Sequence, residues 1–172
     1  MTRRSLFIAM VMVSAALPVL WRSASTAQPA TDQFKGTWTL VSIRYVNPDG
    51  SAIEPFGPQA KGMLVFDGTH FATQVMAANL PKFTSNNRMV GTPREYEAIS
   101  HGVVAYFGTY TVNDADKSIN LRVESSSFPN QNGTQQKRPI TAITDDVLTY
   151  NVPNPAASSG ITHIELVWRR AK

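Results

Sequence analysis

The sequence predicts an all-β domain, an eight-stranded antiparallel up-and-down barrel with one short helix between the third and fourth strands. Eight segments rich in β-branched and aromatic residues follow one another, and most links between them are of hairpin size. Eight strands are the number at which a small barrel encloses side chains or one small ligand. Trp38 near one end of the domain and Arg169-Arg170 at the other meet only if the first and last strands pair.

The amino-terminal segment has the pattern of a cleaved export signal. Arg3-Arg4 precede the apolar residues 6–20, and Ser25 and Ala27 occupy the −3 and −1 positions of a cleavage site. An apolar stretch of this length is shorter than the roughly 20 residues that cross a bilayer. We therefore expect residues 1–27 to be removed, by ordinary secretion or by the twin-arginine route. The protein is then periplasmic or secreted, with no transmembrane anchor.

Charge and cysteine content narrow the function classes. The chain has 16 basic and 12 acidic residues, and the export signal carries three arginines and no acidic residue, which leaves 13 basic and 12 acidic residues in the domain at 28–172. Without a clustered Lys/Arg stripe, nucleic acid is not expected as a partner. The chain has no cysteine, so a lipidated cysteine anchor is excluded, and stability must come from packing and sheet closure.

The strands follow from hydrophobic runs separated by turn residues. Residues 28–33 are interpreted as a polar leader, after which Asn47-Pro48-Asp49-Gly50 ends the first strand and Asp67-Gly68 forms a tight hairpin. The predicted strands are 38–46, 61–66, 69–76, 103–112, 118–126, 134–143, 147–152 and 161–169.

One segment interrupts this meander. Thr92 is a predicted N-cap, Pro93 occupies the first helical position, and Glu95 completes a capping box, so a helix is expected from there to about His101. The preceding residues 79–91 form a long loop. Loop and helix together are either a lid that lies on a barrel mouth or a plain connection across one end.

Six motifs in order resemble the bacterial and fungal lipocalin-like domain family, and the resemblance covers essentially the whole domain. The motifs are Gly36-Thr37-Trp38, Pro55-Phe56-Gly57-Pro58, Tyr106-Phe107-Gly108-Thr109-Tyr110, Glu124 to Asn130, Gly133-Thr134-Gln135-Gln136 with Arg138, and Leu166 to Arg170. The resemblance implies a calycin-type barrel in which Trp38 packs under Arg169 or Arg170, a structural closure. Family members often carry histidines where this chain has residues 120–122, Asn-Leu-Arg, which argues against a shared histidine-dependent reaction.

Several polar residues are candidates for a ligand site. Arg122 and Glu124 share one strand face, either inside the barrel as a pair that orients a ligand carboxylate or carbonyl, or outside as a surface pair. Arg138, across the next hairpin, joins them if that face is internal. Tyr106 and Tyr110 share a face of their strand, as cavity-lining donors or as core aromatics.

The chain gives no pattern for a metal or a cofactor. His70 is retained as a ligand-binding candidate, but it, His101 and His163 lie on different elements without metal-ligand spacing. Gly-x-Ser-x-Gly elbows and Gly-rich phosphate loops are absent from the sequence. We expect no metal and no cofactor.

Three functions are compatible with these observations. The leading one is an exported protein that binds a small apolar or amphipathic molecule in the barrel. The second is a cofactor-free isomerase or cyclase that uses Tyr, Arg and Glu groups. It requires Glu124 or a tyrosine to point inward beside Arg122 or Arg138, with Glu124 as its best general base. The third is an envelope interaction module whose barrel is filled by side chains.

Overall fold

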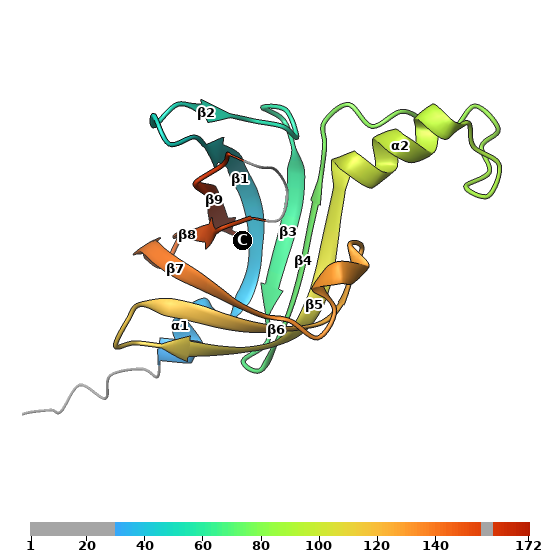
Figure 1. Ribbon diagram of the computed structural model, residues 1–172. Helices are drawn as coiled ribbons and strands as arrows, with labels where there is room; N and C mark the ends of the chain where they lie inside the picture. Colours follow the sequence, from blue (N-terminus) through green and yellow to red (C-terminus); the bar gives the residue numbers. More distant parts are fainter. Residues whose placement is uncertain (1–29, 156–159) are drawn as a thin grey trace, which may run out of the picture.

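The computed structural model describes residues 30–155 and 160–172, so the predicted export signal at 1–27 lies outside the described residues. Within them, the antiparallel strands pair in the order β2-β1-β3-β4-β5-β6-β7-β8-β9, and β1 also pairs with β9. This last pairing closes the predicted eight-stranded barrel (Figure 1), which is therefore confirmed. The barrel strands are β1 (Gly36–Val46), β3 (Lys61–Phe66), β4 (His70–Met76), β5 (Val103–Asn113), β6 (Ser118–Ser126), β7 (Gln135–Ile143), β8 (Val147–Pro153) and β9 (His163–Arg170).

A short additional strand was not predicted. β2 (Ala52–Ile53) pairs with the last two residues of β1 and stands outside the barrel circuit. Along the barrel strands, side chains alternate between the two faces, as pleated strands require. In β4, for example, Phe71, Thr73 and Val75 are buried while the residues between them are exposed.

One end of the barrel is closed by a helix that the sequence interpretation missed. Residues 28–33 were interpreted as a polar leader, but α1 (Ala30–Phe34) is helical and its Phe34 side chain is buried edge-on against Phe66. A helix of five residues is too short for a hydrophobic period to show in the sequence. The Nε1 of Trp38 donates to the Phe34 carbonyl oxygen at 2.9 Å, so α1 and β1 are joined directly.

Arg170 completes this closed end. Its Cζ lies 4.1 Å from the centre of the Trp38 ring, and its Nη1 and Nη2 donate to the carbonyl oxygens of Lys35 and Gln33 at 2.6 and 2.7 Å. Of the two arginines considered for the Trp38 contact, Arg170 is the one in place, whereas Arg169 is exposed. The guanidinium therefore ties the last strand to the first strand and to the segment after α1.

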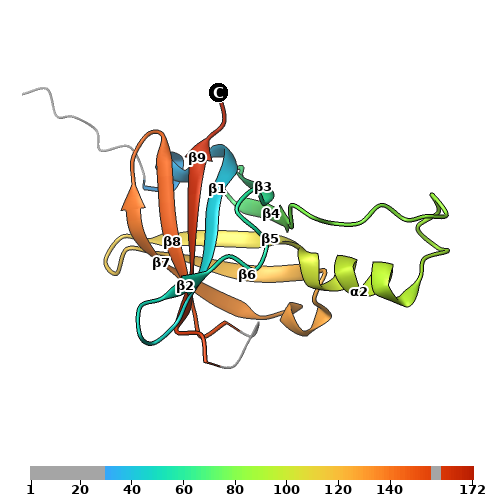
Figure 2. The ribbon, with the colours of Figure 1, turned by 90° about the horizontal axis from the view of Figure 1, so that it is seen from above.

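The segment between β4 and β5 forms an arm that projects away from the barrel (Figures 1 and 2). Its helix is α2 (Pro93–Gly102), and the predicted capping box of Thr92 and Glu95 is present. The Glu95 carboxylate also accepts from the amide and hydroxyl of Thr84, at 2.8 and 3.1 Å. Amide donation from Thr92 and Thr84 lowers the pKa of Glu95 to about 2.

The arm does not act as a lid in this structure. Phe83 packs edge-on against Tyr96, with ring centres 5.4 Å apart, and the Gly91 amide donates to the Tyr96 hydroxyl at 2.7 Å. The loop at 79–91 therefore folds onto its own helix and not onto the barrel. Of the two alternatives for this segment, the lid on a barrel mouth is not the arrangement found, because Tyr96 of α2 packs against Phe83 within the arm.

Candidate functional site

Arg138 is the centre of a polar cluster inside the barrel. It comes from β7 and is only 4% exposed. Its Nη2 donates to the Oε1 of Gln136 and lies 3.5 Å from the hydroxyl of Tyr106 on β5, and its Nη1 donates to the Lys137 carbonyl oxygen at 3.2 Å. The Nε of Arg138 is buried without a hydrogen-bond partner among the described residues. A cationic donor is thus held inside the barrel and incompletely satisfied.

Two tyrosines flank this guanidinium from other strands. Tyr106 packs edge-on against Phe71, with ring centres 5.7 Å apart. Tyr150 on β8 is buried and stacks on Trp168 at 6.5 Å. Desolvation raises the pKa of Tyr150, although the nearby Arg138 charge opposes that shift. Tyr150 is therefore a neutral phenol at physiological pH. We call Tyr106, Gln136, Arg138 and Tyr150 the Arg138 cluster.

The start of β7 is held by the preceding loop, and this positions Gln136. The Thr134 hydroxyl donates to the Gln131 carbonyl oxygen at 2.7 Å and accepts from Nε2 of Gln136 at 3.1 Å. With its amide nitrogen held in this way, Gln136 presents its oxygen to Arg138. Gln136 and Arg138 are two residues apart on the strand, so both point to the same face of the sheet.

A groove of about 440 Å³ connects the Arg138 cluster with the outside, at the end of the barrel opposite α1. Gln136 and Arg138 line both the cluster and the groove. The groove lies between β7, the loop that contains the short helix η1 (Pro129–Gln131), and the end of β8. Its apolar lining residues are Phe128, Val152, Pro153 and Pro155. The groove thus offers an apolar wall outside and a cation inside, a combination that suits an amphipathic molecule.

A larger groove of about 580 Å³ lies on the outer face of the barrel. Met63, Val65, Ala72 and Phe107 from β3, β4 and β5 contribute to its lining. These side chains alternate with the buried ones on their strands, so they face away from the interior. This groove therefore opens on the outer face, and Tyr106 is the one residue of the Arg138 cluster that also contributes to its lining.

The structure does not bring all the sequence candidates together. Tyr106 and Arg138 meet in the cluster, whereas Tyr110 lies deeper, 4.6 Å from Phe66 ring to ring, among the aromatic side chains of the closed end. Desolvation, together with the charge of Asp67, raises the pKa of Tyr110 to about 12. The position of Tyr110 is that of a core aromatic.

Arg122 and Glu124 are exposed and lie on the outer face of β6. Between Phe107 and Gly108 the register of β5 and β6 shifts by one residue, which leaves Glu124 as the extra residue of a β-bulge. A Cβ on Gly108 would lie 2.0 Å from the Arg122 carbonyl oxygen, so this close approach of the two strands requires glycine. The internal arrangement of this pair is therefore wrong, and Glu124 is not available as a base inside the barrel.

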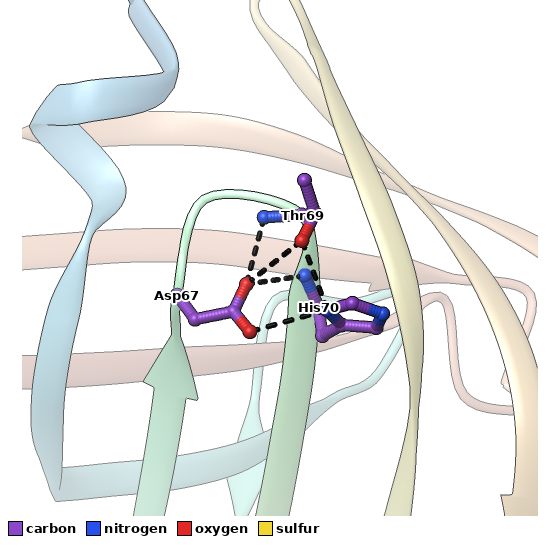
Figure 3. Close-up of polar contacts among 3 residues, drawn as sticks. All are labelled: Asp67, Thr69 and His70. Atoms are coloured by element: carbon purple, nitrogen blue, oxygen red, sulfur yellow. Dashed lines mark hydrogen bonds and ion pairs between the residues drawn. The ribbon is translucent and has the colours of Figure 1, made fainter.

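The His70 side chain is also exposed, at the start of β4 just after the turn from β3 (Figure 3). The carboxylate of Asp67 accepts from the amides of Thr69 and His70, at 2.8 and 2.6 Å, and its other oxygen lies 3.1 Å from His70 Nδ1. These amide hydrogen bonds lower the pKa of Asp67. The arrangement organises a tight turn, and its residues do not reach the Arg138 cluster.

Two members of the cluster, Gln136 and Tyr150, were not among the candidates. Gln136 belongs to one of the motifs that carried the family resemblance, and its two-residue spacing from Arg138 was the available sign of a shared face. Nothing in the local sequence marks Tyr150, which alternates with the polar Thr149 and Asn151 as any core aromatic of a strand does. Within residues 30–155 and 160–172, no group of three or more His, Asp or Glu side chains is placed to bind a metal ion. Nor does any helix there have the length and apolarity to cross a membrane.

Comparison with known proteins places this barrel in a family. The model of the lipocalin-like domain family matches residues 35–171. The 4'-hydroxy-3'-methoxypropiophenone carrier protein ppsC of Aspergillus oryzae is 32% identical over 106 residues, which cover 58% of this chain and 95% of that protein. A redesigned β-barrel aligns with a TM-score of 0.42 at 10% identity, covering 86% of this chain and 100% of the other. Lobster apocrustacyanin A1 aligns with a TM-score of 0.40 at 12% identity, covering 83% of this chain and 63% of the other. Since the family match spans nearly all of the described barrel, the chain belongs to the lipocalin-like domain family.

Proposed function

We propose that this protein binds a small amphipathic molecule, with the polar group of the ligand at the Arg138 cluster and its apolar part in the adjoining groove. The observation that carries the proposal is the buried Arg138 guanidinium, which lines the groove and has a donor without a partner among the described residues. A ligand oxygen at this position would accept from Arg138 while the ligand's apolar surface is removed from water.

One relative supports this class of function. The A. oryzae protein is named as the carrier of a phenone whose name includes hydroxyl and methoxy groups, and this chain covers 95% of that protein. A carrier needs a site that binds its ligand and releases it unchanged. The open groove beside the guanidinium and tyrosine side chains of the Arg138 cluster provides such a site. We further propose that binding takes place after export, in keeping with the pattern of residues 1–27.

The alternative of a cofactor-free isomerase or cyclase loses its main residue. Its best general base was Glu124, which is exposed on the outer face of β6, although its other condition, a tyrosine beside Arg138 inside the barrel, is met by Tyr106. The third alternative supposed a barrel filled by side chains. That holds for the closed end, where the buried side chains include those of Phe34, Trp38, Phe66 and Tyr110. It does not account for the incompletely paired Arg138.

Native mass spectrometry with 4'-hydroxy-3'-methoxypropiophenone as the probe tests the proposal. We expect a one-to-one complex that is lost on denaturation. Val152→Trp, which places an indole in the groove, should abolish the complex, whereas Thr111→Trp on the exposed face of β5 should leave it intact. Absence of any complex with folded protein, or a complex that persists unchanged in Val152→Trp, would contradict the proposal.

A further inference from the structure

The Arg138 guanidinium is a buried cation without a counter-ion. All acidic side chains of the chain lie within residues 30–155 and 160–172, where every carboxylate is described. The ion pairs found there join Asp32 to Lys35, Arg44 to Glu165, Asp67 to His70, and Asp116 to Lys137. None of these involves Arg138, although it is more deeply buried than any of the paired cations.

Neutral oxygens are all that the described residues offer to this charge. They are the Gln136 side-chain oxygen, the Lys137 carbonyl oxygen and, at 3.5 Å, the Tyr106 hydroxyl. Burying a charge is costly unless it is paired and hydrogen-bonded, and a guanidinium carries five N–H hydrogens in a planar fork. The site is therefore electrostatically incomplete in the free protein.

The groove in front of Arg138 is lined by positive charges and by no negative ones. Its charged lining residues are Lys137 and Arg138, both cationic, and no acidic residue lines it. Lys137 is already paired with Asp116 at 2.5 Å, so the uncompensated charge is that of Arg138. A ligand cation would be repelled here, and a neutral ligand would leave the charge unpaired.

Resting on the binding function proposed above, we infer that the natural ligand is an amphipathic carboxylate, a fatty or aromatic acid. Its carboxylate would be held by the Arg138 guanidinium. A planar carboxylate matches the guanidinium fork and can accept from two N–H groups at once. The hydroxyl of Tyr106, 3.5 Å from Nη2 of Arg138, supplies a further donor beside it. The apolar tail then lies along Phe128, Val152 and Pro153.

Matched acid and alcohol probes test the inference. Isothermal titration calorimetry at pH 7.5 would compare decanoic acid with decanol, and 3-phenylpropanoic acid with 3-phenylpropanol, on the protein. We expect the acid of at least one pair to bind about tenfold or more tightly than its alcohol, the gain typical of a charge-assisted hydrogen bond. This ratio is measured on the unchanged protein, so it does not depend on any variant folding.

Variants then assign the preference to Arg138. Arg138→Gln should reduce the ratio of acid affinity to alcohol affinity to about one, and Arg138→Lys should give an intermediate ratio. Arg122→Gln removes an exposed arginine on the outer face of β6 and should change neither affinity. Equal binding of acid and alcohol by the unchanged protein would overturn the carboxylate inference and leave the binding function standing. Failure of every probe, with the phenone also unbound, would overturn both.

Discussion

Replacement of Arg170 by alanine should open the closed end of the barrel and lower its stability. The guanidinium covers the Trp38 ring at 4.1 Å. It also donates to three backbone carbonyl oxygens, those of Gln33, Lys35 and Asp145. These acceptors lie before β1 and in the turn between β7 and β8, so one side chain joins separate segments to the seam of β1 and β9.

The magnitude follows from these contacts. A partly exposed cation–π contact contributes about 0.5–1 kcal/mol. Each of the three hydrogen bonds contributes about 0.5–1 kcal/mol once solvent competition at this partly exposed side chain is allowed for. Arg170→Ala should therefore lower the free energy of unfolding by roughly 2–4 kcal/mol. Arg170→Lys keeps the charge but loses the planar fork, so it should recover only part of this loss.

Urea unfolding followed by tryptophan fluorescence measures the effect, and the neighbouring arginine provides the control. Arg169 is exposed on β9, and its carbonyl oxygen, which accepts from the Thr39 hydroxyl, is kept in an alanine variant. Arg169→Ala should stay within about 0.5 kcal/mol of the unchanged protein. Equal midpoints for the two alanine variants would refute the role given to Arg170, because both remove one positive charge from the same strand end.

Two further predictions concern the bulge and the arm. Gly108→Ala places a Cβ 2.0 Å from the Arg122 carbonyl oxygen, so it should lower the free energy of unfolding by about 1–3 kcal/mol or more in the same urea assay, and an unchanged midpoint would contradict the bulge geometry. Glu95→Gln should make the arm sensitive to pepsin already at pH 4, whereas the arm of the unchanged protein should resist until the pH approaches 2. The sign follows because the pKa of Glu95 is lowered from 4.5 to about 2, so the stabilisation by its carboxylate is complete above the unfolded value and is lost as the pH falls through the folded value. Identical cleavage profiles would show that the bonds to Thr84 and Thr92 do not hold the arm.

The barrel itself could be predicted because its causes are local. Alternation within each strand and turn residues between strands specify hairpins, and a meander of eight hairpin-linked strands has one simple way to bury its apolar face. The closure of the barrel could be predicted from Trp38 and Arg170, since a tryptophan and an arginine at opposite ends of the domain meet only when β1 pairs with β9.

Tertiary placement could not be predicted in the same way. The capping box of α2 is a contact within four residues, and the sequence specified it correctly. Whether α2 packs on the barrel depends on what else its apolar residues can contact, and here Tyr96 packs against Phe83 from the preceding loop. In the same way, α1 is stabilised by the burial of Phe34 under the barrel, a contact that five residues of sequence do not show.

The candidate site depended on which strand face points inward, and two neighbouring strands illustrate the difficulty. On β6, Ile119, Leu121 and Val123 alternate with polar residues, so the apolar set fills the interior and Arg122 lies outside. On β7 the alternation is between two polar sets, and Gln136 and Arg138 face inward although the lysine between them is equally polar. Hydrophobicity alone cannot separate these faces. What separates them is strand register: the pairing of β7 with β6 sets Arg138 opposite Ile119, whose side chain is in the core. A buried arginine then lies where an apolar residue would be more stable, and a site of this kind is expected where a protein gives up stability to bind a ligand.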